Sequence, residues 1–323
     1  MGVGRYPFGY PNGWFQVGYT DDVTAGGVVP LRYFGRDLVL FRSERGVPQV
    51  LDAYCAHLGA HLGYGGSVDG ECIRCPFHAW AYGADGACTN IPYSARIPRG
   101  ARVRAWPTAE RSGILFMWHH SEGQPPTWEP PDVPEFDRDD WVGYHRYRWQ
   151  VRVHPQEIGE NTFDPAHTQF VHGNASGIPD ALVGFEDHRA TATLVIHTAV
   201  LGGAEMRHEL CLYGVGLTRN TSTGATAAKS FLTSNTPIDE EMTDVRFSMM
   251  TPRSLPDDPD GTVSRANAHG TAMAFEEDIP IWEHKIYRDP PLLCDGDRSI
   301  SRYRRWARQF YAPVTDRSVS GAA

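Results

Sequence analysis

The stretch that decides the fold is "CPFHAW", residues 75–80. It places Cys75 and His78 three residues apart, with a proline between them. Upstream, "CAHLGAH" at residues 55–61 supplies a second pair, Cys55 and His57. Glycines surround both pairs, as is common in short loops between strands. Two loops that each carry one thiolate and one imidazole indicate a metal site.

Two kinds of metal site compete for these four residues. One is a Cys₂His₂ zinc site, and the other is a [2Fe–2S] cluster with two cysteines on one iron and two histidines on the other. Zinc fingers usually pair cysteine with cysteine in one loop and histidine with histidine in the other. Here each loop contributes one of each, which favours the cluster. Cys72 is expected to be a small buried residue, and His61 an ordinary loop histidine.

Composition limits the class of protein. The chain has 323 residues with 41% hydrophobic residues, which is enough for two domains, and its net charge of −9 argues against nucleic acid or an anionic membrane as a partner. The N-terminal residues lack the apolar run of a signal peptide, and no run is long enough to cross a bilayer. We therefore expect a cytoplasmic protein without a membrane span. In that compartment cysteines bind metal more often than they form disulfides.

The pattern of predicted secondary structure changes near residue 140. Short β runs fill residues 14–118, and a linker rich in proline and acid follows at residues 121–140. We therefore predict one domain over 1–140 and a second over 141–323. The second domain is predicted to contain a helix that starts at Pro155 and is disturbed at Pro165, four long alternating strands of one antiparallel sheet, and two late helices at 275–287 and 297–311.

A second metal site is indicated by "ENTFDPAHTQFVH", residues 160–172. His167 and His172 can converge on one metal if the helix is irregular, and Pro165 supplies that irregularity. A non-haem Fe(II) site needs two histidines and one carboxylate, with open positions for O₂. The spacing alone does not choose the carboxylate, for which the candidates are Glu160, Asp164, Glu276, Glu277 and Asp278.

These motifs resemble those of the Rieske oxygenases. "CPFHAWAYGADGACTNIP" is similar to the cluster motif of the oxygenase branch, and residues 164–172 match the mononuclear-iron motif D-x-x-H-x-x-x-x-H. In order along the chain, "FGRDLVLFR", "ENTFDPAHTQFVH", "EEDIPIWEHKIY" and "RYRRWARQFY" resemble the branch that holds the oxygenase component of 3-ketosteroid 9α-hydroxylase and the cholesterol 7-desaturases.

The resemblance implies roles for particular residues. The cluster ligands would be Cys55, His57, Cys75 and His78, and the mononuclear Fe(II) ligands would be His167, His172 and Asp278, the last at the start of a helix. Asp164 and Asn161 would be catalytic. Asp164 would link His167 to the cluster histidine of the neighbouring subunit in a homotrimer.

The resemblance also implies a fold and an activity. The fold would be α+β, with an N-terminal antiparallel β Rieske [2Fe–2S] domain and a C-terminal helix-grip catalytic domain with an antiparallel sheet. The activity would be hydroxylation of an unactivated C–H bond in an apolar, polycyclic, steroid-like substrate, using O₂ and electrons from a separate flavin/iron–sulfur reductase or ferredoxin. Desaturation or oxidative cyclisation of a sterol or other natural product, a pure electron carrier, and a zinc-stabilised binding module remain as alternatives.

Overall fold

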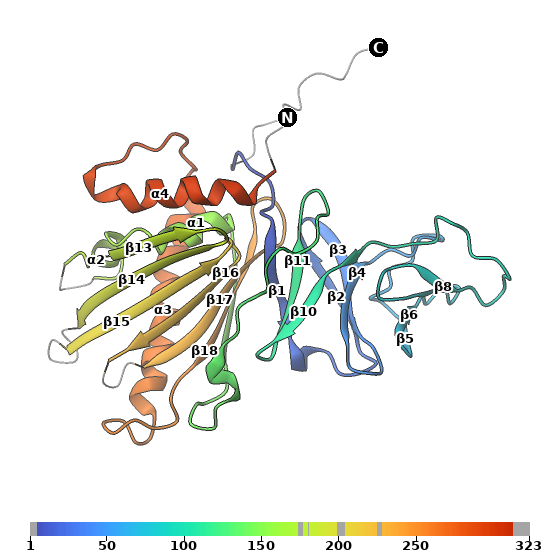
Figure 1. The fold of residues 1–323 in the computed structure, drawn as a ribbon, viewed down its shortest axis with the longest axis horizontal. Helices are drawn as coiled ribbons and strands as arrows, with labels where there is room; N and C mark the ends of the chain where they lie inside the picture. Colours follow the sequence, from blue (N-terminus) through green and yellow to red (C-terminus); the bar gives the residue numbers. More distant parts are fainter. Residues whose placement is uncertain (1–4, 174–176, 180, 199–203, 225–227, 313–323) are drawn as a thin grey trace, which may run out of the picture.

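The computed structural model describes residues 5–173, 177–179, 181–198, 204–224 and 228–312. Two β-rich parts lie side by side along the long axis of the molecule (Figure 1). The first part consists of small antiparallel sheets, and the second is one large sheet covered by helices. The predicted fold class, an antiparallel β domain followed by an α+β domain with an antiparallel sheet, is confirmed.

The N-terminal part contains eleven short strands among the described residues. They form three antiparallel sheets with the orders β1-β11-β10, β2-β3-β4-β9 and β5-β6-β7-β8. The strands are β1 (Gly13–Tyr19), β2 (Val28–Tyr33), β3 (Arg36–Arg42), β4 (Pro48–Asp52), β5 (Ser67–Asp69), β6 (Cys72–Arg74), β7 (Ala81–Tyr82), β8 (Cys88–Asn90), β9 (Ala105–Trp106), β10 (Thr108–Arg111) and β11 (Ile114–His119).

The C-terminal part is built on a seven-stranded antiparallel sheet of the order β12-β18-β17-β16-β15-β14-β13. Its strands are β12 (His145–Val151), β13 (Ala181–Glu186), β14 (Arg189–Thr198), β15 (Ala204–Tyr213), β16 (Leu217–Thr223), β17 (Lys229–Pro237) and β18 (Thr243–Met250). The α-helices are α1 (Pro155–Asn161), α2 (His167–Phe170), α3 (Thr262–His284) and α4 (Arg298–Ala307). Short 3₁₀ turns lie at Thr20–Asp22, Pro134–Asp137, Asp295–Asp297 and Arg308–Phe310.

Other elements cover both faces of the large sheet. Side chains alternate between the two faces of a strand, so each strand packs against elements on both sides. On the inner face, Phe231 and Phe247 pack with Phe275 of α3. On the outer face, Leu232 and Met250 pack against β1 and β11 of the N-terminal part. This explains why every residue of β17 and β18 is buried, whereas a one-sided sheet would bury only alternate residues.

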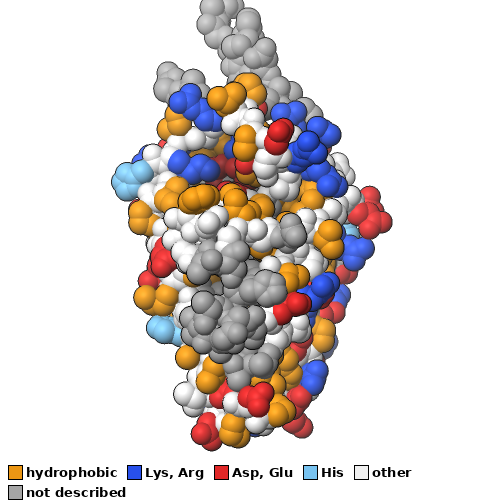
Figure 2. Space-filling view, turned by 90° about the vertical axis from the view of Figure 1, so that its left-hand side faces the viewer, with side chains coloured by type: hydrophobic (Ala, Val, Ile, Leu, Met, Phe, Trp, Pro, Cys, Tyr) orange, Lys and Arg blue, Asp and Glu red, His pale blue; other side chains and the backbone are white. Residues whose placement is uncertain are grey.

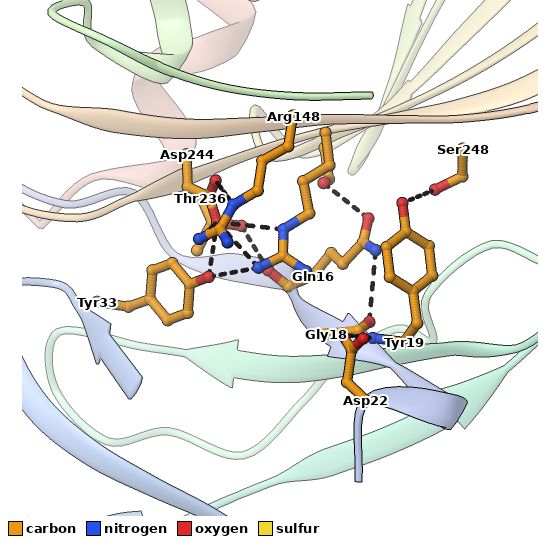
Figure 3. A network of polar contacts seen from close by, with 11 residues as sticks. Gln16, Gly18, Tyr19, Asp22, Tyr33, Arg148, Thr236, Asp244 and Ser248 are labelled. Atoms are coloured by element: carbon orange, nitrogen blue, oxygen red, sulfur yellow. Dashed lines mark hydrogen bonds and ion pairs between the residues drawn. The ribbon is translucent and has the colours of Figure 1, made fainter. Parts of the chain in front are cut away.

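A buried polar network joins the two parts at this outer face (Figure 3). The carboxylate of Asp244 accepts hydrogen bonds from Arg148 at 2.7 Å, from Arg246 at 3.0 Å and from the Tyr33 hydroxyl at 2.6 Å. Nearby, the Gln16 side chain accepts a hydrogen bond from a serine hydroxyl on β17 at 2.8 Å. The network pairs every charge that the interface buries at this point, as buried charges require.

Two stretches of the chain differ from the sequence prediction. The helix predicted to start at residue 275 is α3, and it begins at Thr262. Asp278 therefore lies well inside α3 and not at the start of a helix. Residues 262–274 carry Gly270 and several small polar residues, which weaken the amphipathic pattern. The run 206–217 is not one strand: β15 ends at Tyr213, and β16 follows after a turn.

The domain boundary remains a prediction. The last strand of the N-terminal part ends at His119 and the first strand of the large sheet begins at His145. The extreme N-terminal segment, however, packs on the C-terminal part: Arg5 donates hydrogen bonds to the carbonyls of Lys285 and Arg152, and the Asn12 amide donates to the Phe310 carbonyl. None of the helices in the described part of the chain could span a lipid bilayer.

Candidate active site

The four predicted cluster ligands lie on two neighbouring loops. Cys55 and His57 follow β4, while Cys75 and His78 lie between β6 and β7. The two imidazole rings lie with their centroids 4.8 Å apart, and His57 stacks on Trp80 at 4.7 Å. Both thiols are buried. The two loops therefore bring together the two thiolates and two imidazoles that the sequence indicated.

The donor atoms of these loops fit a cluster. Burial raises the pKa of the Cys75 thiol, and the neighbouring Cys55 sulfur adds to that rise. Two adjacent buried thiols would be costly as thiolates unless a metal compensated them. Nδ1 of His78 is buried and has no hydrogen-bond partner among the described residues. A buried imidazole nitrogen without a partner is expected of a metal ligand.

Tyr82 of β7 contacts the loop that carries Cys55 and His57. Its hydroxyl lies 3.1 Å from Sγ of Cys55 and accepts a hydrogen bond from the Ala56 amide at 3.1 Å. Sequence reasoning missed this residue, because its role depends on the pairing of β7 with β6 and not on a local motif.

Cys72 lies outside the site. It is half-buried on β6, with Sγ 3.4 Å from the Thr89 hydroxyl, so it is less buried than predicted.

A second group of donors lies in the C-terminal part. One ligand atom each of His167, His172 and Asp278 lie within 4.8 Å of one another. His167 opens α2, His172 follows α2, and Asp278 is a buried residue of α3. The break between α1 and α2, over 162–166, turns the two histidines toward α3, as the sequence predicted for Pro165.

The structure separates the five candidate carboxylates. Glu160 is held by Arg304 at 2.8 Å, and Glu276 accepts a hydrogen bond from the Trp149 indole at 3.0 Å. The carboxylate of Asp164 accepts hydrogen bonds from the backbone amides of Ala166 and His167. Asp278 alone of the five belongs to the described two-histidine group.

Hydrogen bonds orient both histidines of this group. Nδ1 of His167 donates to the backbone carbonyl of Asp164, and Nδ1 of His172 lies 2.8 Å from Oε2 of Glu277. In each ring Nε2 is thereby left for a metal. The sequence had Glu277 only as a possible ligand; the structure gives it contact with the far side of His172. Asp164 contacts the His167 ring through its backbone carbonyl, while its carboxylate accepts hydrogen bonds from backbone amides.

The charges of this group suit a divalent cation. Nε2 of His172 lies 3.5 Å from Oδ2 of Asp278, whose hydrogen bond raises the pKa of His172, with Glu277 adding to the rise and burial opposing it. The carboxylates of Glu277 and Asp278 therefore lie against the two nitrogens of one imidazole. Two neutral imidazole nitrogens and one carboxylate oxygen form the donor set of a non-haem Fe(II) site.

Asn161, predicted to be catalytic, ends α1 close to this group. Its backbone carbonyl accepts a hydrogen bond from the Asp164 amide at 3.2 Å. Asn161 is half-buried, and its side-chain amide has no hydrogen bond to another described residue. Its catalytic role stays a prediction.

The inner face of the large sheet packs on α3, the helix that carries Asp278. Phe231, Phe247 and Met249 lie on this face within the core. Phe170 is 78% exposed and lines no described interior surface. Figure 2 views the end of the molecule that carries the large sheet, and it shows hydrophobic side chains gathered on the upper half of this face beside charged ones.

Comparison with known families gives two matches that together span most of the chain. Residues 13–107 match the Rieske [2Fe–2S] domain, which confirms the predicted cluster cofactor. Residues 117–311 match the 3-ketosteroid 9α-hydroxylase C-terminal domain. The loops that carry the two Cys–His pairs lie within the first match, and the two-histidine, one-carboxylate group lies within the second.

Individual relatives agree with these matches. The chain is 35% identical over 335 residues to a probable 3-ketosteroid-9-alpha-monooxygenase oxygenase component of Rhodococcus rhodochrous, covering 97% of this chain and 83% of that protein. It is 33% identical to the cholesterol 7-desaturase nvd of Drosophila melanogaster, covering 94% and 75%. Among solved structures, dicamba monooxygenase bound to 3,6-dichlorosalicylic acid shares the fold, with a TM-score of 0.75 and 19% identity over 93% of this chain and 97% of that chain.

Proposed function

Because this chain belongs to the family of Rieske-type monooxygenases that includes the 3-ketosteroid 9α-hydroxylase oxygenase components, we propose that it hydroxylates an unactivated C–H bond of a steroid-like polycyclic substrate. The observation that carries this proposal is the group formed by His167, His172 and Asp278. A Rieske domain without such a group would suit an electron carrier.

We assign mononuclear Fe(II) to this group and the [2Fe–2S] cluster to Cys55, His57, Cys75 and His78. When bound, the iron supplies O₂ activation and the cluster supplies electrons. The protein's own residues orient these ligands: the Asp164 carbonyl and Glu277 fix the imidazole rings, and α3 holds Asp278 buried beside them. The apolar wall of the sheet places the substrate and excludes water.

A separate reductase or ferredoxin is the proposed source of electrons, and a homotrimer the proposed assembly. The arrangement of the chain supports the trimer. The cluster loops beside β5 and β6 lie at one end of the molecule, and α2 lies at the opposite end (Figure 1). Electrons therefore have a short path only if the cluster end of one subunit meets the α2 end of the next. Asp164, next to α2, is the residue that we propose for this junction.

A second outcome at the same site is desaturation or oxidative cyclisation. The similarity to a cholesterol 7-desaturase is nearly equal to the similarity to the 9α-monooxygenase components, so it favours the same substrate class without choosing the product. The product depends on which C–H bond faces the iron. We place the enzyme in the cytoplasm, where its six free cysteines would stay reduced.

Turnover tests the proposed activity. Purified protein with a surrogate reductase would be supplied with a panel of 3-ketosteroids, sterols and small aromatic acids, and products would be identified by mass spectrometry. Addition of one oxygen to a steroid supports hydroxylation, and loss of two hydrogens supports desaturation. Turnover of small aromatic acids alone would contradict the substrate class.

Two matched variants test the assigned ligands. Asp278→Asn should lower mononuclear iron content, whereas Asp164→Asn should retain both metal centres but nearly abolish product formation. Iron content and single-turnover product are measured side by side. Loss of iron in Asp164→Asn together with retention in Asp278→Asn would reverse the two roles.

A further inference from the structure

A buried lysine lies on the inner face of the large sheet, away from the metal group. Lys229 opens β17 and is 4% exposed, and Phe231 two residues later belongs to the core between the sheet and α3. The Lys229 ammonium donates hydrogen bonds to Oδ1 of Asn267 at 2.8 Å and to the Thr271 hydroxyl. Both partners belong to α3 and both are neutral.

This ammonium has no counter-charge within the part of the chain that the structure describes. No described carboxylate forms an ion pair with it, and one of its three N–H donors has no described acceptor. Burial lowers its pKa to about 8, so it is still mostly charged at neutral pH. An unpaired buried charge is expensive, and a buried ammonium is normally paired with an opposite charge. Lys229 is also unusual in this chain, where Lys285 is the only other lysine.

A second buried polar atom without a described partner, Nε2 of His208, lies on the same inner face of the sheet. The register pairs His208 with Ser222 and Ser222 with Lys229, so the three side chains share the inner face. The Ser222 hydroxyl lies 2.8 Å from Nδ1 of His208, while Nε2 of His208 is buried without a described partner. Burial lowers the pKa of His208 to about 3, so the ring is neutral.

Helix α3 sets the distance from this row to the metal group. Asn267, Thr271 and Asp278 are spaced by four and seven residues, which places them along one side of the helix. At 1.5 Å per residue, Thr271 lies about 10 Å and Asn267 about 16 Å along the axis from Asp278. Ala274, between them on the same side, adds little bulk. This separation is of the size of a fused polycyclic skeleton.

Building on the proposed function, we propose that the substrate is a polycyclic acid whose carboxylate is bound by Lys229 and His208 at the end remote from the oxidised carbon. The carboxylate supplies the missing counter-charge and accepts the free N–H of Lys229. The protonated nitrogen of the neutral His208 ring can be Nε2 when Ser222 donates to Nδ1, which gives a second donor. The skeleton then lies along α3 toward Asp278.

Binding of three probes tests this inference without turnover. Cholanic acid, methyl cholanate and androstenedione would be titrated into the metal-loaded protein by calorimetry. We expect the acid to bind at least about tenfold more tightly than its ester, as a hydrogen bond to a charged group implies. Equal binding of acid and ester, or tighter binding of the neutral ketone, would overturn the proposal.

Two lysine variants complete the test. Lys229→Met should remove the preference for the acid and leave binding of the ester within about twofold. Lys285→Met changes the net charge equally at a lysine that pairs with Glu157 at 2.7 Å, and it should keep the preference. Persistence of the preference in Lys229→Met would overturn the assignment, and thermal melting verifies that both variants fold. If the acid preference holds but no steroid is oxidised, the proposed function fails and the binding site stands.

Discussion

Replacement of Asp244 by asparagine should destabilise the protein strongly. The Asp244 side chain is fully buried and pairs with Arg246, whose side chain is 7% exposed, and with Arg148, whose side chain is 56% exposed. Asparagine keeps the shape but removes the negative charge, so Arg246 is left as a buried cation without a counter-charge. Breaking a buried pair from one side costs about 3–5 kcal/mol, whereas loss of the exposed pair adds at most about 1 kcal/mol.

Denaturant unfolding measures this effect. The free energy of unfolding, taken by linear extrapolation from fluorescence, should fall by about 3–5 kcal/mol in Asp244→Asn with an unchanged slope. The matched control Arg148→Gln removes the exposed partner of the same carboxylate and should cost no more than about 1 kcal/mol. If Asp244→Asn lay within about 1 kcal/mol of the wild type, the network would not be the interdomain anchor that its geometry indicates.

Three further predictions concern pH, packing and the cluster. Burial lowers the pKa of His119 to about 4, and its Nδ1 lies 2.9 Å from the Pro11 carbonyl, so the folded state binds fewer protons than the unfolded state between about pH 6.5 and pH 4. Stability should therefore fall as pH drops through this range, and His119→Phe should flatten the plot of unfolding midpoint against pH; an unchanged slope would contradict the reasoning. In Gly216→Ala a Cβ would lie 2.4 Å from the Phe15 ring, so the melting temperature should drop by an amount equivalent to about 1–3 kcal/mol, whereas Gly100→Ala, with nothing within 4 Å, should match the wild type. Cys75→Ser should remove the visible absorption of the cluster while Cys72→Ser retains it, and a spectrum that survives in Cys75→Ser would exclude Cys75 as a ligand.

The sequence was most informative where the chemistry is local. The two Cys–His pairs and the pair His167/His172 could be found from spacing, because each pair lies in a single short segment. The choice of Asp278 among five carboxylates needed a family resemblance, since helix α3 brings it to the histidines from more than a hundred residues away.

Features that depend on long-range pairing were not predictable. Residues 262–274 gave no clear helical pattern, yet they form the first half of α3 because Ala268 and Ala272 pack on the large sheet. The row that contains His208 and Lys229 depends on the register of three strands. A sequence read segment by segment contains no signal for that register.

The burial of both faces of the large sheet determines how the protein can be divided. Residues 1–140 expressed alone would expose Trp14, Ile114 and Phe116 to water, and residues 141–323 alone would expose Leu232 and Met250. Neither half has a complete surface of its own. The two parts should therefore melt in a single cooperative transition, and a change at their junction should lower the stability of the cluster-bearing part and the substrate-binding part together.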